Sequence, residues 1–239
     1  MDKLTLPLVI FGLMQYAAFI ISFTFHEAAH AWSAWKLGDS TAYNEGQVTL
    51  NPWAHMQRSP IGTMLMPLVS FIFLGYILGW ASAPYSPVWA ERWPKRHFLM
   101  SMAGPLMNLL LLIAALIGMR AILQFSGVHL LDLVPLPDAY RQMMGMPSSP
   151  AIRFFGMLNM MMQLNLLLLV FNLLPIPPLD GSSIWQLALP TRAYKRYQEF
   201  AQDPNFIMLG LIVGSALTRE ILYKVYPWIQ EFLVWGLTR

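Results

Sequence analysis

The chain of 239 residues is 56% hydrophobic and only 11% charged, which excludes an ordinary soluble globule and indicates an integral membrane protein. Its net charge of +3 is modest and comes without a long basic run, so we expect no nucleic-acid partner. The sequence has no cysteine, which excludes disulfides and thiolate metal sites, so any zinc ligands must be His, Asp or Glu.

The first predicted element is an apolar helix from Leu4 to Leu37, ended by Gly38 and the polar residues that follow it. No charged residue lies between Leu4 and Phe25. This stretch alone is long enough to cross a bilayer, so we expect a membrane span near the start of the chain.

The same helix carries the motif His26-Glu27-Ala28-Ala29-His30. Histidines four residues apart lie on one helix face, so both imidazoles can reach a single metal ion. Glu27 is near enough to the open position of that metal to take a proton from bound water. His26 lies about 33 Å along the helix, toward one face of the bilayer, where ionisable residues mark function. The alternative, two satisfied histidines paired with Glu27 at a helix interface, explains the charge but leaves the spacing unexplained.

The pattern changes to extended structure between residues 46 and 52. Polar and apolar side chains alternate through Val48, Thr49 and Leu50, with Gly46 before them and Pro52 after them. We therefore expect a short β-hairpin near the membrane face.

Apolar segments fill most of the remaining chain. Segment 65–80 is broken by Pro67, Gly75 and Gly79, so it is either a short span or a re-entrant segment. Spans are predicted at 98–119, 154–174 and 206–217, a loop at 122–149, and an interfacial segment or sixth span at 223–237. The predicted fold is an all-α polytopic membrane protein with about five or six transmembrane or re-entrant helices and the short membrane-associated β-hairpin.

Two basic loops, at 92–96 and 192–196, indicate the orientation. Both are expected on the cytoplasmic side by the positive-inside rule, with one span out and one span back between them. If segment 65–80 re-enters, the reading we favour, the N-terminus lies outside and His26-Glu27 lies near the cytoplasmic face.

A third metal ligand is needed, because a hydrolytic zinc usually has three protein ligands and an open position for water. Most downstream carboxylates lie in polar loops or at helix ends, namely Asp132, Asp138, Glu199, Asp203, Glu220 and Glu231. Asp180 instead lies between two apolar stretches, after prolines at 175, 177 and 178 break the helix. An unpaired carboxylate would be costly there, and a metal would satisfy it. Capping of the next helix is an alternative that is compatible with metal binding.

Two asparagines, Asn108 and Asn172, lie in apolar surroundings. Each could bind a substrate backbone or polarise a scissile carbonyl. Hydrogen bonding between helices, a common use of Asn in membranes, explains them equally well.

These motifs closely resemble those of the site-2 protease family of intramembrane zinc metalloproteases. The resemblance is carried by three segments, His26-Glu27-x-x-His30, Gly104-Pro105-x-x-Asn108 and Asn172-x-x-Pro175-x-Pro177-x-Leu179-Asp180-Gly181, together with Gly46 to Pro52. They occur in the order typical of the family and span about two-thirds of the chain. Departures at His55-Met56-Gln57-Arg58-Ser59-Pro60 and at Gly79-Trp80-Ala81-Ser82-Ala83-Pro84 fall in loops on the substrate side and concern specificity more than chemistry.

The resemblance implies that His26, His30 and Asp180 bind Zn²⁺ and that Glu27 is the general base. It also implies that the hairpin around Val48, Thr49 and Leu50 contacts the substrate, and that Asn108 and Asn172 border the active site. Residues 1–239 would form one integral membrane metalloprotease domain, with its core motifs at 26–181 and no room for a PDZ domain between the spans.

The expected function is zinc-dependent cleavage of peptide bonds within or near transmembrane segments of other membrane proteins. The expected partners are such substrates and the lipid bilayer, and the expected location is a bacterial inner membrane crossed several times. A catalytically inactive zinc-binding scaffold would share the ligands. A metal transporter would need several intramembrane ligands along a path, whereas this chain offers one cluster.

Overall fold

Four long helices dominate the computed structural model, which describes residues 6–75, 77, 79–80, 82–126 and 150–235. They are α1 (Leu6–Lys36), α6 (Pro94–Phe125), α8 (Pro150–Leu173) and α11 (Pro204–Val234). Each contains a stretch long and apolar enough to cross a membrane. The expected all-α class is thus confirmed for the described residues, in which no strand occurs, whereas the expected number of five or six membrane segments remains a prediction.

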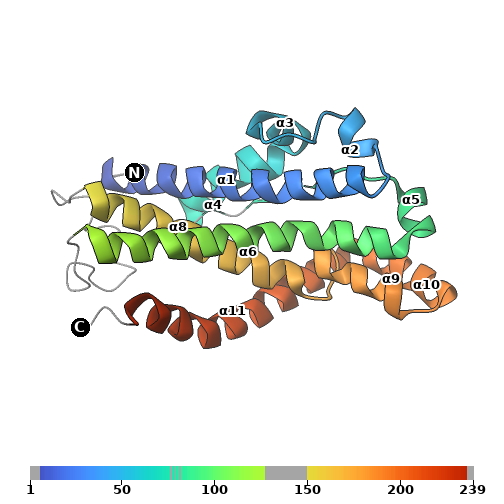
Figure 1. Ribbon diagram of the computed structural model, residues 1–239. Helices are drawn as coiled ribbons and strands as arrows, with labels where there is room; N and C mark the ends of the chain where they lie inside the picture. Colours follow the sequence, from blue (N-terminus) through green and yellow to red (C-terminus); the bar gives the residue numbers. More distant parts are fainter. Residues whose placement is uncertain (1–5, 76, 78, 81, 127–149, 236–239) are drawn as a thin grey trace.

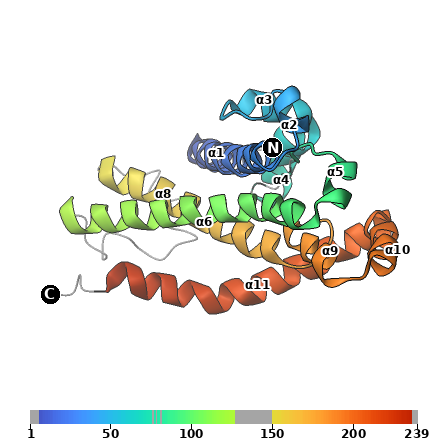
Figure 2. The same ribbon diagram turned by 45° about the vertical axis from the view of Figure 1, so that its right-hand side comes forward.

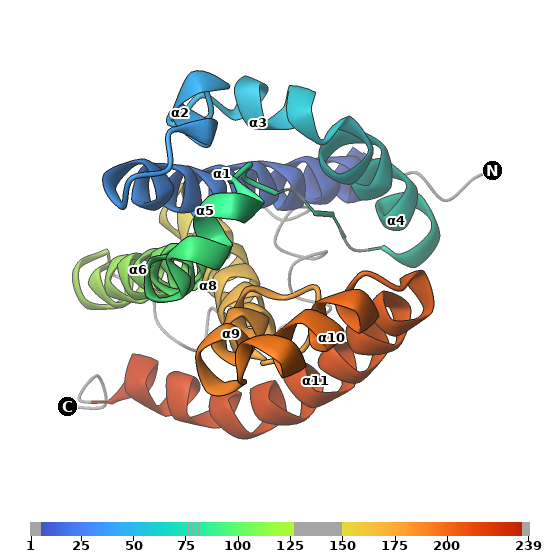
Figure 3. The ribbon, with the colours of Figure 1, turned by 90° about the vertical axis from the view of Figure 1, so that its right-hand side faces the viewer.

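Successive long helices run in opposite directions along one bundle, so that α1 and α8 are parallel to each other, as are α6 and α11 (Figure 1). Helix α6 packs against both α1 and α8. Viewed along the bundle, α8 lies between α1 and α11, and α6 lies beside it (Figure 3). Many leucine, isoleucine and valine side chains on the outer faces are exposed, as expected for helices that contact lipid.

Short helices connect α1 to α6. They are α2 (Thr41–Asn44), α3 (Pro52–Arg58), the π-helix η1 (Ile61–Leu65), α4 (Met66–Leu74) and α5 (Pro87–Arg92). The apolar part of η1 and α4, Ile61–Phe73, falls in the class of helices shorter than 18 residues. Helix α1 ends and α6 begins at the same end of the bundle (Figure 1), an arrangement compatible with the re-entrant segment expected at 65–80, which remains a prediction.

The basic segments 92–96 and 192–196 lie at this same end. The first joins α5 to α6, and the second belongs to α10 (Thr191–Ala201), which follows η3 (Asp180–Ile184) and α9 (Trp185–Ala188). Figure 2 shows α5, α9 and α10 together at this end of the bundle. The cytoplasmic location of this end remains a prediction.

The predicted β-hairpin is wrong for the described residues, because segment 47–50 is a loop of bends. Two backbone groups of this segment are hydrogen-bonded to nearby residues. The Gln47 N–H donates to the Ala42 carbonyl (2.8 Å), and His55 Nε2 bonds the Thr49 carbonyl (2.9 Å). Asn51 then caps α3 by accepting from the Trp53 N–H (3.0 Å). No neighbouring strand lies in the described chain to form a ladder, so the alternating pattern does not become a ribbon.

The C-terminal apolar segments also differ from expectation. Instead of a short span at 206–217 and a separate segment at 223–237, one helix, α11, runs through both. Asp203 caps it by accepting from the Asn205 N–H (2.8 Å), and Pro204 occupies the first turn, where its missing N–H costs nothing. Pro227 lies within this helix, as membrane helices tolerate.

The main hydrophobic cluster lies between α6 and α8, with α11 against it. Its buried members include Leu112 and Met119 of α6 and Phe155, Met162 and Leu166 of α8. The interior next to α1 is different, because it holds buried polar side chains at Ser22, Asn108 and Asn165. Such groups are expensive inside a membrane bundle unless they are hydrogen-bonded, so they direct attention to this region.

Candidate metal centre

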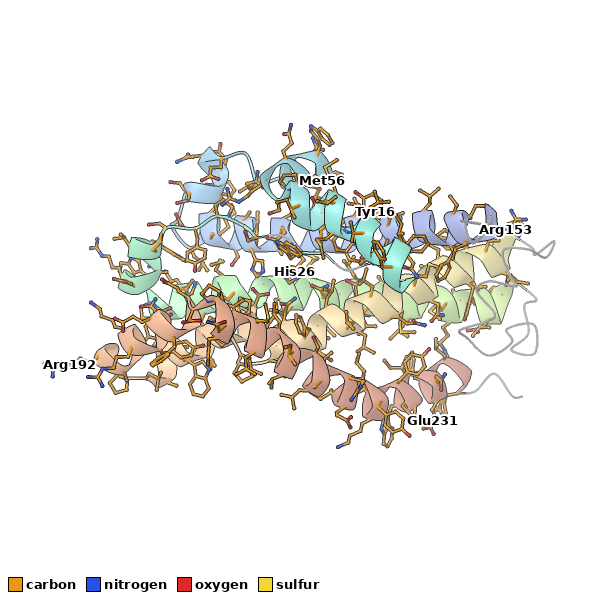
Figure 4. The ribbon with its side chains drawn as sticks, turned by 180° about the vertical axis from the view of Figure 1, so that it is seen from behind. Tyr16, His26, Met56, Arg153, Arg192 and Glu231 are labelled. Atoms are coloured by element: carbon orange, nitrogen blue, oxygen red, sulfur yellow. The ribbon has the colours of Figure 1, made fainter. Side chains whose placement is uncertain are left out.

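The two histidines of the motif lie on the buried face of α1. His26 and His30 are each less than a tenth exposed, and their rings meet edge to face with centroids 4.6 Å apart. His26 points from α1 toward α6 in the interior of the bundle (Figure 4). It lies ten residues before the end of α1, or about 15 Å, which is well inside a helix of membrane-spanning length.

Asp180 reaches the histidines from the turn that follows α8. The turn is held by hydrogen bonds from the Leu179 N–H to the Ile176 carbonyl (2.9 Å) and from the Trp185 indole N–H to the Pro175 carbonyl (2.7 Å). Asp180 is the first residue of η3, and no side-chain hydrogen bond caps that helix in the described structure. The turn therefore places the carboxylate in the bundle, where it faces α1.

The three candidate ligand atoms lie close together. Asp180 Oδ2 is 3.2 Å from His26 Nε2 and 3.3 Å from His30 Nε2, and the two nitrogens are 3.0 Å apart. Ligands bound tetrahedrally at about 2.0–2.1 Å from Zn²⁺ would be about 3.3 Å from one another. The group therefore has the size of one face of a zinc coordination tetrahedron, and it could hold a metal ion.

The chemistry of the donor atoms also fits a cation. His26 Nδ1 hydrogen-bonds Asn108 Oδ1, and His30 Nδ1 donates to the Met100 carbonyl (2.9 Å). With the proton on Nδ1 in each neutral ring, both Nε2 atoms present lone pairs to Asp180 Oδ2, which is buried without a hydrogen-bond partner. Three converging lone pairs repel one another unless a metal ion or a proton lies between them. The residues present therefore fit zinc.

Helix α6 approaches the ligand pair through a glycine. A Cβ atom on Gly104 would lie 2.3 Å from His30 Nε2 and 2.6 Å from His26 Nε2, closer than any real contact. Met100, Gly104 and Asn108 recur every four residues and so form one face of α6. Gly104 belongs to the motif Gly104-Pro105-x-x-Asn108, but that motif does not reveal its contact with both imidazoles.

Glu27 lies between the two ligands in the sequence and is buried, with 6% of its surface exposed. Its Oε2 atom has no hydrogen-bond partner in the described part of the molecule. A buried carboxylate oxygen without a partner is costly unless it receives a proton or a water. This is the environment expected of a general base beside a metal-bound water.

The asparagines occupy different settings. Asn108 is fully buried, with its oxygen on His26 and its nitrogen donating to Asn165 Oδ1 (3.0 Å), so its amide is used between helices. Asn172 is half-buried in the last turn of α8, and no side-chain hydrogen bond is formed by it within the described chain. Its amide is therefore available to another molecule.

The predicted substrate segment lies beside the start of α3. Val48 and Thr49 are half-buried, and Leu50 is 58% exposed. The Thr49 carbonyl is already bonded to His55, whereas no backbone hydrogen bond of Val48 or Leu50 is found in the described structure.

One further network of contacts near the site is not predictable from the sequence. His97 Nδ1 bonds Gln186 Oε1 (2.7 Å), and Gln186 Nε2 donates to the Ala90 carbonyl (2.7 Å), which ties α6, α9 and α5 together. The Tyr85 ring lies against His97, with centroids 5.0 Å apart. Burial, followed by the charge of Asp180, raises the pKa of Tyr85, so its hydroxyl remains a donor at neutral pH. No spacing rule predicts such a contact.

Comparison with known proteins agrees with this geometry. The family model described as Peptidase family M50 matches residues 14–214. YwhC of Bacillus subtilis, which carries a zinc metalloprotease name, is 35% identical over 218 residues, covering 90% of this chain and 87% of that protein. Rip2 of Mycobacterium tuberculosis (strain H37Rv), named in the same way, is 32% identical over 230 residues, covering 94% and 76%.

Rip2 of Mycolicibacterium smegmatis, also given a zinc metalloprotease name, is 26% identical over 223 residues, covering 92% of this chain and 74% of that protein. No solved structure matches the chain significantly. The family match covers most of the chain, including every residue of the candidate centre. The chain therefore belongs to peptidase family M50, the site-2 protease family, and is a multi-pass membrane zinc metalloprotease.

Proposed function

We propose that this metalloprotease hydrolyses peptide bonds within or near the transmembrane segments of other membrane proteins. The observation that carries the proposal is the depth of the centre. His26 lies about 15 Å from the end of a membrane-spanning helix, and its partners come from α6 and from the turn after α8. A site placed there is within reach of a peptide bond in the bilayer.

Glu27 is the proposed general base. Its unpaired carboxylate oxygen would accept a proton from the attacking water and would later deliver that proton to the leaving amine. His26, His30 and Asp180 would hold zinc, whose Lewis acidity activates water and polarises a carbonyl when it is bound. The enclosing helices would keep bulk water away from the rest of the substrate, so that water reaches only the reacting bond.

Two groups are proposed to hold the substrate. The half-buried amide of Asn172, which has no hydrogen-bond partner among the described residues, would hydrogen-bond a substrate carbonyl. The backbone groups of Val48 and Leu50, which are not hydrogen-bonded within the described chain, would pair with a locally unwound substrate. A helical substrate must unwind in this way because its scissile bond is otherwise shielded.

The proposed substrates are proteins with transmembrane helices, and the proposed location is a bacterial inner membrane. A catalytically inactive zinc-binding scaffold is the second candidate, because it would share the same ligands. The unpaired Glu27 oxygen favours catalysis, since a scaffold has no use for a buried carboxylate that binds nothing.

The test uses proteoliposomes with a panel of single-span proteins whose transmembrane segments contain Gly, Asn or Pro. We expect the native chain to cleave some members and Glu27→Gln to lose about 10²- to 10⁴-fold in rate while keeping about one zinc per chain. Cleavage at the native rate by Glu27→Gln would refute the mechanism. Zinc binding without cleavage of any panel member would favour the scaffold.

A further inference from the structure

We propose that Asn165 is a positioning residue of the metal centre. It orients the amide of Asn108, and Asn108 thereby fixes His26 in the tautomer that can bind metal. This inference rests on the zinc centre of the proposed function. It adds to that centre a series of hydrogen bonds that runs from the Met161 carbonyl of α8 through the buried amides of Asn165 and Asn108 to His26. We call this series the relay.

The relay starts at the Met161 carbonyl, which can only accept. An amide atom of Asn165 lies 2.8 Å from that oxygen, so it must be the nitrogen Nδ2. The second proton of Nδ2 is donated to Ser22 Oγ, 2.9 Å away on α1. The orientation of the Asn165 side chain is thus set by a carbonyl oxygen that can act only as a hydrogen-bond acceptor.

The oxygen of Asn165 must then face the other way, toward α6. Asn165 Oδ1 lies 3.0 Å from the amide of Asn108, which has to present its nitrogen there. Once the Asn108 nitrogen is committed to Asn165, only its oxygen remains for His26 Nδ1. Each amide in the chain therefore fixes the direction of the next.

The last step decides whether His26 can be a ligand. Facing an acceptor oxygen, Nδ1 carries the ring proton, and Nε2 directs its lone pair at the site shared with His30 and Asp180. If the Asn108 amide were reversed, its N–H would donate to Nδ1. The ring proton would then move to Nε2, and that nitrogen could not bind metal.

Burial makes the relay effective, because no water is at hand to replace a lost partner. Ser22, Asn108 and Asn165 are each completely buried. His30 is oriented by a simpler device, since its Nδ1 donates directly to the Met100 carbonyl. The relay and the Met100 carbonyl both keep the ring proton on Nδ1 of a metal ligand. Removing hydrogen-bond partners of this kind usually lowers metal affinity about 10- to 100-fold.

The test compares Asn165→Leu with Asn165→Asp and with the control Asn159→Leu. A carboxyl group at position 165, protonated in this buried setting, still presents an oxygen to Asn108 Nδ2 and a donor to the Met161 carbonyl, whereas leucine presents neither. Asn159 offers a matched control because its amide is equally buried on the same helix, where it accepts from Gln163 (3.4 Å). Zinc affinity is measured by competition with a chelator, and the His26 tautomer is read by ¹⁵N NMR of the metal-free, histidine-labelled protein.

We expect Asn165→Leu to bind zinc about 10- to 100-fold more weakly and to show His26 protonated partly on Nε2. Asn165→Asp should stay within a few-fold of the native affinity, and Asn159→Leu should match the native chain in both readouts. Native zinc affinity and an unchanged tautomer in Asn165→Leu would overturn the relay, as would an equal loss in Asn159→Leu. If the native chain bound no zinc, the proposed function would fail, while the tautomer would still test the relay.

Discussion

Single residues at four-residue spacing build this centre. On α1, Ser22, His26 and His30 share one face, and α6 presents Met100, Gly104 and Asn108 in the opposite order against it. The antiparallel match brings Asn108 to His26 and Met100 to His30. Gly104 lies between these two contacts, where any side chain would displace the imidazoles.

Replacing Gly104 should therefore damage metal binding specifically. The methyl group of Gly104→Ala would overlap His30 Nε2, and overpacking of this kind costs about 1–3 kcal/mol. That corresponds to zinc affinity weaker by about 5- to 150-fold, measured by chelator competition. Gly118→Ala on the same helix is the control, because its methyl would meet only the end of the Leu158 side chain. Equal zinc affinity in both variants would contradict the close approach.

Removal of the third ligand gives a second prediction at this scale. Purified native protein should carry about one zinc per chain, because a catalytic site has three protein ligands, and Asp180→Ala should lose most of it. Elemental analysis in detergent measures the content. If Asp180→Ala kept its full zinc, Asp180 would not be a ligand, and another carboxylate would have to supply the third bond.

At the scale of elements, the segment carrying Asp180 is held from two sides. Gln186 of α9 bonds both His97 of α6 and the Ala90 carbonyl of α5, and Trp185 bonds the Pro175 carbonyl. These contacts keep η3 and α9 against the bundle, so that the carboxylate remains near the histidines. The Asp180 segment thus depends on residues far from it in the chain.

Loss of the Gln186 contacts should loosen this segment without removing a ligand. Each buried hydrogen bond contributes about 1 kcal/mol, so we expect Gln186→Leu to bind zinc several-fold more weakly and to cleave more slowly. Gln198→Leu, on the neighbouring α10, serves as a control. The same zinc affinity in native protein and Gln186→Leu would show that the Asp180 segment holds its place without this bond.

The sequence predicted the long helices well because their signal is local. Apolar length, the proline and glycine breaks, and the spacing of the metal ligands are all properties of consecutive residues. The alternating pattern of segment 47–50 predicts a strand wrongly, because a strand needs a ladder partner and no local pattern tells whether one exists. The end of the chain was divided in two because the charged residues Arg219 and Glu220 interrupt its apolar pattern, although both lie exposed on one continuous helix.

The candidate site is likewise predictable only where its residues are marked by local sequence features. His26, Glu27 and His30 follow from spacing along one helix, and Asp180 from its apolar setting. Asn165, Gln186 and Tyr85 were not found, because their roles depend on contacts between helices far apart in the chain. Such contacts require the packed bundle.

At the scale of the whole molecule, both basic segments lie at the end of the bundle where α1 finishes. Arg192 lies at this end and Arg153 lies at the opposite one (Figure 4). Positive segments of short loops are retained on the cytoplasmic side. We therefore expect this end to face the cytoplasm and the N-terminal end of α1 to lie on the other side.

The orientation can be measured directly, because the native chain has no cysteine. In sealed right-side-out membranes, an impermeant thiol reagent should label Ser126→Cys and should leave Lys195→Cys unlabelled until the membranes are opened. These positions lie at opposite ends of the bundle, after α6 and on α10. Labelling of Lys195→Cys alone in sealed membranes would reverse the assignment.

Helix α11 links the centre to the thickness of the bilayer. A Cβ on Gly210 would lie 2.2 Å from the Pro177 carbonyl, so α11 touches the turn that delivers Asp180 almost backbone to backbone. Its 31 residues extend about 46 Å, longer than the roughly 30 Å of hydrocarbon that they must cross, and such a helix relieves the mismatch by tilting. Because α11 contacts the Asp180 turn at Gly210, a change in the tilt of α11 would also move that turn. The acyl-chain length of the surrounding lipid should therefore change the affinity of the site for metal.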